Sequence, residues 1–362
     1  MMAWYRIRIA RAPALALVLL LMLPACAPLV RHQFTRVCMG VRTDIITYAP
    51  SAAKAESAAA AAFDRIAEIE QVLSDYRPTS EASRLSARAG GEPTPVSADM
   101  LRVLIESSRI SAATDGAFDV TVGPLVLLWR EARRLGQLPD PAALAAARQL
   151  VDWRSIEIDE RAGTVRLVRP GMRLDFGGIG KGYAASEALV VMRGHGCART
   201  LVALAGDIAV GAPPPRRAGW SIAVGGMSEP LAAADAATAT SARGSPPADD
   251  AHFADDPMLT LVLLDAAVST SGDESQFIII DGRRYSHIVD PRTGLGTTGG
   301  LAVTVISPRG EWSDALSTAL CVLGEAGAET VAAFGPSIAV MFREAARTRL
   351  VDPSSMVRWK EP

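Results

Sequence analysis

Two pairs of apolar segments, each joined by a tight turn, constrain the fold most strongly. Residues 277–280 and 283–288 flank an Asp-Gly pair, which is typical of the turn in a β-hairpin. Residues 164–168 and 172–176 alternate in polarity around a Pro-Gly turn and also predict paired strands. Hairpins join antiparallel strands, so these pairs argue against a doubly wound parallel sheet.

Helical and strand patterns alternate along the rest of the chain. Helices are predicted at 52–72, 99–113, 124–134, 139–150, 183–193 and 313–323, and strands at 201–204, 220–224, 259–264 and 301–306. Residues 227–256 are rich in Ala, Ser, Pro and Asp and predict a mobile inserted loop. No linker divides the chain after residue 38. The sequence therefore predicts one α+β domain, with a mixed, largely antiparallel sheet and packed helices.

Charge and aromatic content exclude one class of partner. The 362 residues include 37 Lys plus Arg and 39 Asp plus Glu, which gives a formal charge of −2. A sequence-independent nucleic-acid binder needs a dense basic face. Only 5 % of residues are aromatic, so a stacking platform for single strands is also not expected. No nucleic-acid partner is predicted.

The N-terminus is typical of an export signal. Three arginines precede an apolar run of ten residues, 14–23, which is too short for a spanning helix of about 20 residues. The run ends in Leu-Pro-Ala-Cys26, which resembles a bacterial lipobox. We expect a signal peptide over 1–25, lipidation at Cys26 and a lipid-anchored linker over 26–37. The alternative is an ordinary secretory signal cleaved nearby.

The remaining cysteines do not predict a metal site or a disulfide framework. Cys38, Cys197 and Cys321 are odd in number and widely spaced, with no CxxC pair. Cys321 lies in an apolar helical pattern and is interpreted as a core residue.

A glycine-rich loop carries one of only three lysines in the chain. The segment from Leu174 to Tyr183 reads strand, glycine loop, helix, with Lys181 near its end. Such a loop can present backbone N–H groups to an anion at a helix N-terminus. It is neither a Walker A motif nor a GxGxxG motif. The alternative is a glycine-rich turn with an exposed lysine.

Asp314 and Thr318 are four residues apart on a predicted helix, so they share one face. They lie on the flank of the apolar arc, where a side chain is expected to be half-buried. A carboxylate and a hydroxyl there could hold a hard cation through oxygen. The alternative is an ordinary acidic residue in the first helical turn behind a Ser313 N-cap.

His287 ends a predicted hairpin strand and precedes an Asp-Pro-x-x-Gly turn. An imidazole with a pKa near 6.5 is a natural general base at neutral pH. His32, His195 and His252 lie in less ordered contexts. A structural histidine is the alternative at position 287.

Together these segments resemble the ApbE family of FAD:protein FMN transferases. The resemblance covers about residues 38–325, and eight short motifs recur in chain order. They are Met39-Gly40, Ser74 to Pro78 with Ser80-Glu81, Asp115 to Thr121, Asp175 to Tyr183, Gly206-Asp207-Ile208, Ser271-Gly272-Asp273, His287 to Gly294, and Asp314 to Thr318.

The resemblance implies a Mg²⁺-dependent transferase that uses FAD as its substrate. It would move the FMN half of FAD to a Ser or Thr hydroxyl of a partner protein as a phosphoester and release AMP. His287 would be the catalytic base. The FAD contacts would be Met39, Tyr76, Ala117, Phe118, Asp119, Asp175, Lys181 and Ile288. The metal ligands would be the Gly178 carbonyl, Asp314 and Thr318.

The resemblance also implies an architecture and a location. The transferase domain would span 38–345, followed by a C-terminal tail over 346–362. A lipid-anchored enzyme would lie in the periplasm of a bacterial cell envelope, and its acceptor could be a subunit of an envelope redox complex. Departures from the family pattern occur at Val41, Ser86, Gly180 and Ala205.

Two other functions use the same residues or a subset of them. An FAD pyrophosphatase would deliver water to the same phosphate and yield FMN and AMP. A non-catalytic flavin-binding lipoprotein would need no base beside the scissile bond.

Overall fold

A large antiparallel sheet forms the centre of the computed structural model, which describes residues 28–224, 259–273, 276–344, 347–352 and 358–360. Within those residues the sheet has eight strands in the order β1-β2-β6-β7-β10-β13-β14-β15. The strands are β1 (Val30–Cys38), β2 (Val41–Ala49), β6 (Thr200–Leu204), β7 (Asp207–Val210), β10 (Ala266–Ser271), β13 (Ala302–Ser307), β14 (Ala339–Glu344) and β15 (Arg347–Val351). The antiparallel α+β prediction is confirmed.

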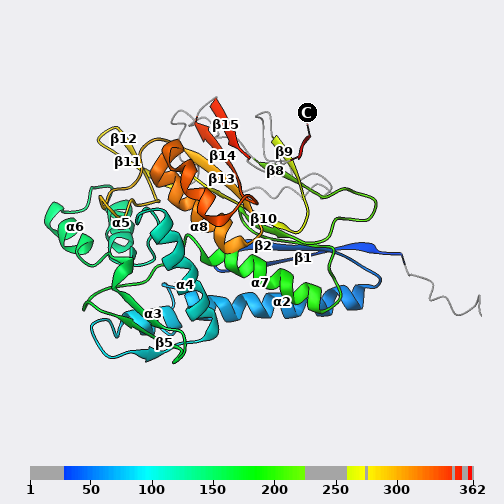
Figure 1. The fold of residues 1–362 in the computed structure, drawn as a ribbon, viewed down its shortest axis with the longest axis horizontal. Helices are drawn as coiled ribbons and strands as arrows, with labels where there is room; N and C mark the ends of the chain where they lie inside the picture. The colour runs from blue at the N-terminus through cyan, green and yellow to red at the C-terminus, as the bar shows by residue number, and fades with distance from the viewer. Residues whose placement is uncertain (1–27, 225–258, 274–275, 345–346, 353–357, 361–362) are drawn as a thin grey trace, which may run out of the picture.

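Helices cover one face of this sheet (Figure 1). Helix α2 (Ala52–Leu73) packs on α7 (Gly180–Gly194), and α7 packs on α8 (Gly310–Leu323). Helix α8 also lies against β10 and β13. Helices α3 (Glu81–Ser86) and α4 (Ala98–Ala113) pack on α2, and α4 also packs on α8. The site described below forms where α7 and α8 begin.

Alternating side chains on the central strands build a core on each face of the sheet. On β14, Val340 and Phe342 pack into the cluster shared with the helices, whereas Ala339 and Met341 pack into the opposite cluster. The opposite cluster lies against a second sheet of β8 (Trp220–Val224), β9 (Leu259–Leu263) and β16 (Arg358–Lys360). Period-two alternation thus places the large sheet between two apolar layers.

A third core holds the predicted hairpin, whose strands are β11 (Phe277–Ile280) and β12 (Arg283–Ser286). The hairpin packs on α5 (Gly123–Leu135) and α6 (Pro141–Arg148). The Trp129 indole N–H donates to the Gly294 carbonyl at 2.8 Å, which ties α5 to the turn after His287.

One predicted strand is wrong. A three-stranded sheet contains β3 (Thr94–Pro95), β5 (Thr164–Leu167) and β4 (Ile156–Asp159), but residues 172–176 are not a strand of it. The N–H groups of Leu174 and Asp175 donate instead to the Ser86 hydroxyl and the Val120 carbonyl. The apolar alternation of 172–176 reflects burial, and the backbone N–H groups bond to the Ser86 side chain of α3 and to the loop that contains Val120.

The predicted domain boundaries need two corrections. Residues 30–37, expected in a linker, belong to β1, because their backbone pairs with β2 along its whole length. The expected C-terminal tail contributes β15 to the edge of the large sheet and β16 to β9. Cys26 and the predicted loop 227–256 lie outside the described residues. In the part of the chain that is described, no helix combines the length and apolarity needed to cross a bilayer.

Candidate active site

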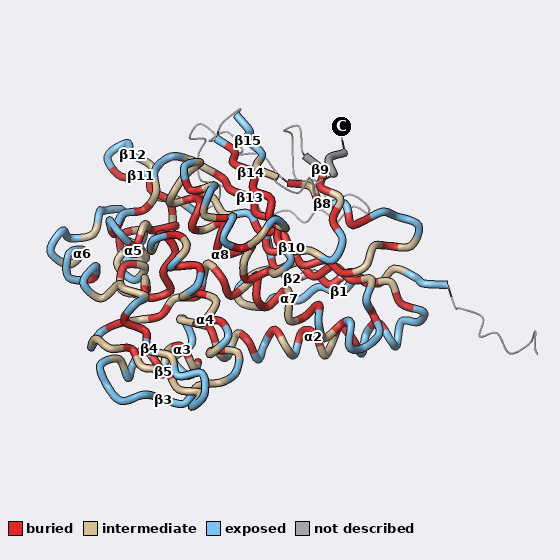
Figure 2. Tube along the Cα trace, in the orientation of Figure 1, coloured by how far each residue is buried: buried red, intermediate tan, exposed pale blue. Residues whose placement is uncertain are grey.

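The first turns of α7 and α8 touch through glycine. A Cβ atom on Gly182 would overlap the carbonyl oxygen of Gly310, and a Cβ on Gly310 would overlap that of Gly182. Only glycine permits this approach of two backbones. The contact brings the Gly182 N–H within 3.0 Å of the Asp314 carboxylate, to which it donates. Both helices are largely buried here (Figure 2).

Lys181 faces two buried carboxylates. Its Nζ lies 3.0 Å from Asp207 Oδ2 and 3.9 Å from Asp314 Oδ2, and both carboxylates are less than a tenth exposed. Burial and the neighbouring Asp207 charge raise the pKa of Asp314 to about 7. Burial opposes the charged form of Lys181, but the two carboxylates outweigh it and raise its pKa. The ammonium group of Lys181 therefore neutralises part of the charge of both carboxylates.

Two expectations about α8 are wrong. Asp314 is 2 % exposed, not half-buried, because the glycine contact closes α7 over it. Ser313 is not the N-cap, since α8 begins earlier, at Gly310, and the Ser313 hydroxyl donates to the Gly310 carbonyl. The alternative of an ordinary aspartate in the first helical turn behind a Ser313 N-cap therefore does not apply.

Thr318 and the glycine loop complete an oxygen-rich corner. A Cβ atom on Gly178 would lie 3.0 Å from Thr318 Oγ1, so the loop backbone runs directly against this hydroxyl. The Thr318 hydroxyl also lies 3.2 Å from the Ser271 hydroxyl. Carboxylate, hydroxyl and carbonyl oxygens suit Mg²⁺. No group of three or more His, Cys, Asp or Glu in the described residues could hold a metal, so a cation here would rely on such mixed oxygens.

His287 presents one ring nitrogen as an acceptor. Its Nδ1 lies 3.1 Å from the Gln276 carbonyl oxygen, which also accepts the backbone N–H of His287 at 2.9 Å. A carbonyl can only accept, so Nδ1 carries the proton and Nε2 has the free lone pair. Burial lowers the pKa of His287, and the charges of Arg133 and Lys181 act in the same direction. The ring is therefore a neutral base at pH 7.

Tyr76 and Asp175 meet through an arginine that the sequence analysis missed. The Arg130 guanidinium lies 4.0 Å from the centre of the Tyr76 ring, 3.3 Å from Asp175 and 2.6 Å from Asp75. Tyr76 is 75 % exposed, so the side of its ring away from Arg130 can stack with a planar ligand. Arg130 belongs to no recognised motif; it is one of several arginines on an amphipathic helix, so no sequence signal distinguished it.

The side chains of residues 117–119 are buried within the protein. Ala117 and Phe118 are buried, and both Asp119 oxygens accept hydrogen bonds, from Thr121 and from the Trp153 N–H. Burial raises the pKa of Asp119 despite these bonds. The segment lies beside Asp175, whose N–H donates to the Val120 carbonyl.

Met39 and Ile288 are the first and the last of the predicted FAD contacts in the sequence. Met39 occupies the β1–β2 turn with a positive φ of 50°, and its Cε would lie 3.6 Å from a Cβ on Gly180. The turn therefore contacts the start of α7. Ile288 is buried in the core shared by the sheet and the helices, directly after His287.

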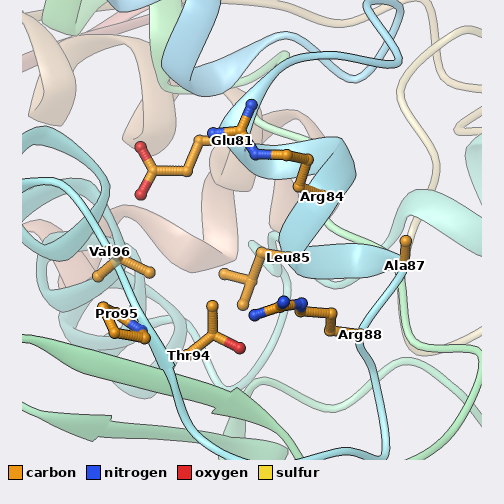
Figure 3. Close-up of a pocket in the computed structure, with 8 residues that line it drawn as sticks. All are labelled: Glu81, Arg84, Leu85, Ala87, Arg88, Thr94, Pro95 and Val96. Atoms are coloured by element: carbon orange, nitrogen blue, oxygen red, sulfur yellow. The ribbon is translucent and has the colours of Figure 1, made fainter.

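A separate pocket lies between α3 and β3, with a volume of about 490 Å³. Figure 3 shows Glu81, Arg84, Arg88 and Thr94 around its apolar floor of Leu85. None of the predicted site residues lines it.

Comparison with known proteins identifies the family. Residues 39–342 match the model of the ApbE family. The FAD:protein FMN transferase of Salmonella typhimurium is 31 % identical over 265 residues, which cover 72 % of this chain and 69 % of that protein. The enzyme of the same name from Treponema pallidum is 30 % identical, covering 75 % and 73 %.

Solved structures agree with this assignment. The structure described as flavin transferase ApbE from Vibrio cholerae superposes with a TM-score of 0.73 at 26 % identity, covering 91 % of this chain and 99 % of that one. The apo form of the Pseudomonas stutzeri flavinyl transferase ApbE gives a TM-score of 0.71 at 26 % identity, covering 90 % and 96 %. The family match spans most of the chain, and the chain belongs to the ApbE family.

Proposed function

We propose that this protein transfers the FMN half of FAD to a Ser or Thr hydroxyl of a target protein and releases AMP. The names of its relatives support flavin transfer to protein. The observation that carries the proposal in this chain is the buried pair Asp207 and Asp314, which shares a single lysine beside a glycine loop. Such a corner suits a cation and a phosphate more than it suits a packed core.

Asp314, Thr318 and the Gly178 carbonyl would hold Mg²⁺. All the proposed donor atoms are oxygens, which Mg²⁺ prefers. The raised pKa of Asp314 indicates that the positive charge around its carboxylate does not compensate for its burial, and a bound cation would do so. When bound, the ion would offset negative charge on the phosphate oxygens of FAD. Lys181 would supply a second positive charge beside the same phosphates.

The flavin end of FAD would lie toward Tyr76. Its exposed ring, backed by Arg130, offers a flat face for a planar heterocycle. Met39 contacts the start of α7 at Gly180, Asp175 accepts the Gly177 N–H of the glycine loop, and Ile288 follows His287 in the chain. Ala117, Phe118 and Asp119 would contact FAD mainly through backbone atoms, because their side chains are buried and Asp119 accepts hydrogen bonds within the protein.

His287 would take the proton of the acceptor hydroxyl at Nε2. The acceptor oxygen attacks the phosphorus of the FMN half, a new P–O bond forms, and the bond from that phosphorus to the bridging oxygen breaks. The electron pair leaves with AMP. Phosphoryl transfer of this kind depends chiefly on positioning and charge neutralisation, with one base for the weak nucleophile.

The protein would act at the bacterial cell envelope. The basic and apolar start of the sequence and the Leu-Pro-Ala-Cys26 motif support export and lipidation. The folded domain would then face the periplasm, where a subunit of an envelope redox complex could be its acceptor.

Mass spectrometry tests the proposed reaction. The protein lacking residues 1–26 would be mixed with FAD, Mg²⁺ and an acceptor domain that carries a Ser or Thr flavinylation site. We expect the acceptor to gain the mass of FMN less one water, with AMP in solution and no gain after chelation. Free FMN and AMP without acceptor modification would indicate a pyrophosphatase. Intact FAD with two different acceptors would indicate a flavin-binding protein.

A further inference from the structure

The carbonyl of Gln276 sets the tautomer of His287, so whatever holds this carbonyl also controls the base. Gln276 precedes β11 and is exposed, and its carbonyl accepts both the ring Nδ1–H and the backbone N–H of His287. An exposed residue before a short two-stranded sheet is a weak support by itself. A further constraint is needed to keep the carbonyl in place.

Arg284 supplies contacts on both sides of Gln276. Its Nη2 donates to the Asp273 carbonyl oxygen at 2.6 Å, and its Nε lies 2.9 Å from Asp273 Oδ2. The face of the same guanidinium lies 3.8 Å from the centre of the Phe277 ring. Asp273 comes before Gln276 in the chain and Phe277 directly after it. One side chain therefore contacts the chain before and after Gln276, at Asp273 and at the Phe277 ring.

Burial makes this pairing stronger than a surface ion pair. The Asp273 side chain is 4 % exposed and that of Arg284 is 24 % exposed. Among the described residues, no donor makes a well-aligned hydrogen bond to either Asp273 carboxylate oxygen. Asp273 thus depends on the Arg284 charge, and a buried charge that loses its partner is costly. Arg284 lies on β12, which ends at Ser286, the residue before His287.

We propose that Arg284, paired with Asp273, is a positioning residue for the base: it holds the Gln276 carbonyl against His287 Nδ1 so that Nε2 stays free. This inference rests on the proposed function, in which His287 Nε2 accepts the proton of the acceptor. Arg284 itself touches neither the reacting atoms nor FAD. It acts through the orientation and tautomer of the imidazole.

Kinetics of Arg284→Gln provide the first test. We expect kcat for FMN transfer to fall about 10-fold to 100-fold, the scale of a misplaced catalytic group, while KM for FAD changes less than about twofold. Arg284→Lys keeps the charge and the ring contact and should recover part of the rate. The matched control is Arg283→Gln: this exposed neighbour lies 5.4 Å from the Tyr285 ring and does not contact Asp273 or Gln276. Its kcat should equal that of the unmodified protein.

Imidazole NMR provides a second test that needs no flavin transfer. In ¹⁵N-histidine-labelled protein, with His287→Gln used to assign the signal, we expect the Nδ1–H tautomer at His287. Arg284→Gln should shift this signal toward the Nε2–H tautomer, and Arg283→Gln should leave it unchanged.

Three results would overturn the inference. They are an Nε2–H tautomer in the unmodified protein, an unchanged tautomer in Arg284→Gln, or a kcat for Arg284→Gln within twofold of the unmodified protein. If the unmodified protein transfers no FMN, the proposed function fails, whereas the NMR comparison still decides whether Arg284 sets the tautomer. If Arg284→Gln does not fold, Arg284→Lys is compared with Arg283→Lys in the same two measurements.

Discussion

Helices α7 and α8 carry two charged clusters that differ in how well their carboxylates are paired. In the first, among the described residues, each of three guanidinium groups contacts two of four carboxylates. The arginines are Arg65, Arg102 and Arg309, and the acids are Asp99, Glu106, Glu187 and Glu311. In the second cluster, Lys181 is the one cation in the described part of the chain that pairs with Asp207 and Asp314.

The two clusters shift the pKa values of their aspartates Asp99 and Asp314 in opposite directions. Hydrogen bonds from Arg65 lower the pKa of Asp99 in spite of its burial. Burial and the Asp207 charge raise the pKa of Asp314 to about 7. Each cluster has one carboxylate more than it has cations, but the first has three arginines for four carboxylates and ties α2 and α4 to the two helices. The second has one lysine for two carboxylates. This lower ratio of cations to carboxylates, together with the raised pKa of Asp314, distinguishes the candidate binding site from the ion network on the same helices.

Replacing Asp314 should have the largest effect. Asp314→Ala removes the only carboxylate in the proposed metal set, so we expect metal-dependent turnover to fall about 10³-fold or more, since metal assistance supplies several kcal/mol. AMP release with and without Mg²⁺ measures the loss. Asp99→Ala, in the cluster of three arginines, is the control and should lower stability while keeping the Mg²⁺ dependence. Full activity of Asp314→Ala in a chelator-treated assay would remove the metal assignment.

Replacing His287 should slow transfer without abolishing FAD binding. Loss of a general base typically costs 10²-fold or more, so His287→Ala should reduce the transfer rate by about that factor. Its affinity for FAD, measured by flavin fluorescence, should stay close to that of the unmodified protein. An unchanged transfer rate would mean that another group or solvent takes the proton.

Disrupting the glycine contact between α7 and α8 should have a smaller effect, on the stability of the protein. Gly182→Ala forces a Cβ into the Gly310 carbonyl and should lower the free energy of unfolding by about 1–3 kcal/mol. Gly194→Ala, at the other end of α7, meets no atom within 4 Å and should be neutral or slightly stabilising. Urea unfolding compares the two. Equal stability of both variants would show that the helices do not require this close approach.

The pH profile should show the smallest effect. Burial lowers the pKa of His287 below 6.5, and the active form is the neutral ring. At saturating Mg²⁺, kcat/KM should therefore stay constant at neutral pH and fall only below pH 6.5, about tenfold per unit. A fall that begins above pH 7 would be inconsistent with a depressed pKa at this base.

Much of the fold was predictable because its signals are local. Alternation and helical periodicity located most helices and the β11–β12 hairpin within a few residues. Residues 172–176 were predicted as a strand because buried and half-buried residues alternate there, although the backbone bonds to α3 and to a loop. Residues 30–37 lie at the edge of the sheet and are largely exposed, so β1 had no apolar signal.

The sequence named candidate site residues but gave no information about their environment. Motifs named Lys181, His287, Asp314 and Thr318, whereas the burial of Asp314 follows from a contact between glycines 128 positions apart, Gly182 and Gly310. Long-range pairings of this kind leave no local pattern. Arg130 and Arg284 were missed for the same reason, since their partners come from other elements or turns.

Cation binding at Asp314 is the measurement that bears most directly on the difference between the two clusters. Mn²⁺, as a paramagnetic substitute for Mg²⁺, would be titrated into the unmodified protein, Asp314→Asn and Asp99→Asn in the presence of FAD, with free Mn²⁺ measured by electron paramagnetic resonance. We predict one bound ion per chain in the unmodified protein and in Asp99→Asn, and its loss in Asp314→Asn. Equal binding by all three proteins would contradict a cation site at the α7–α8 contact.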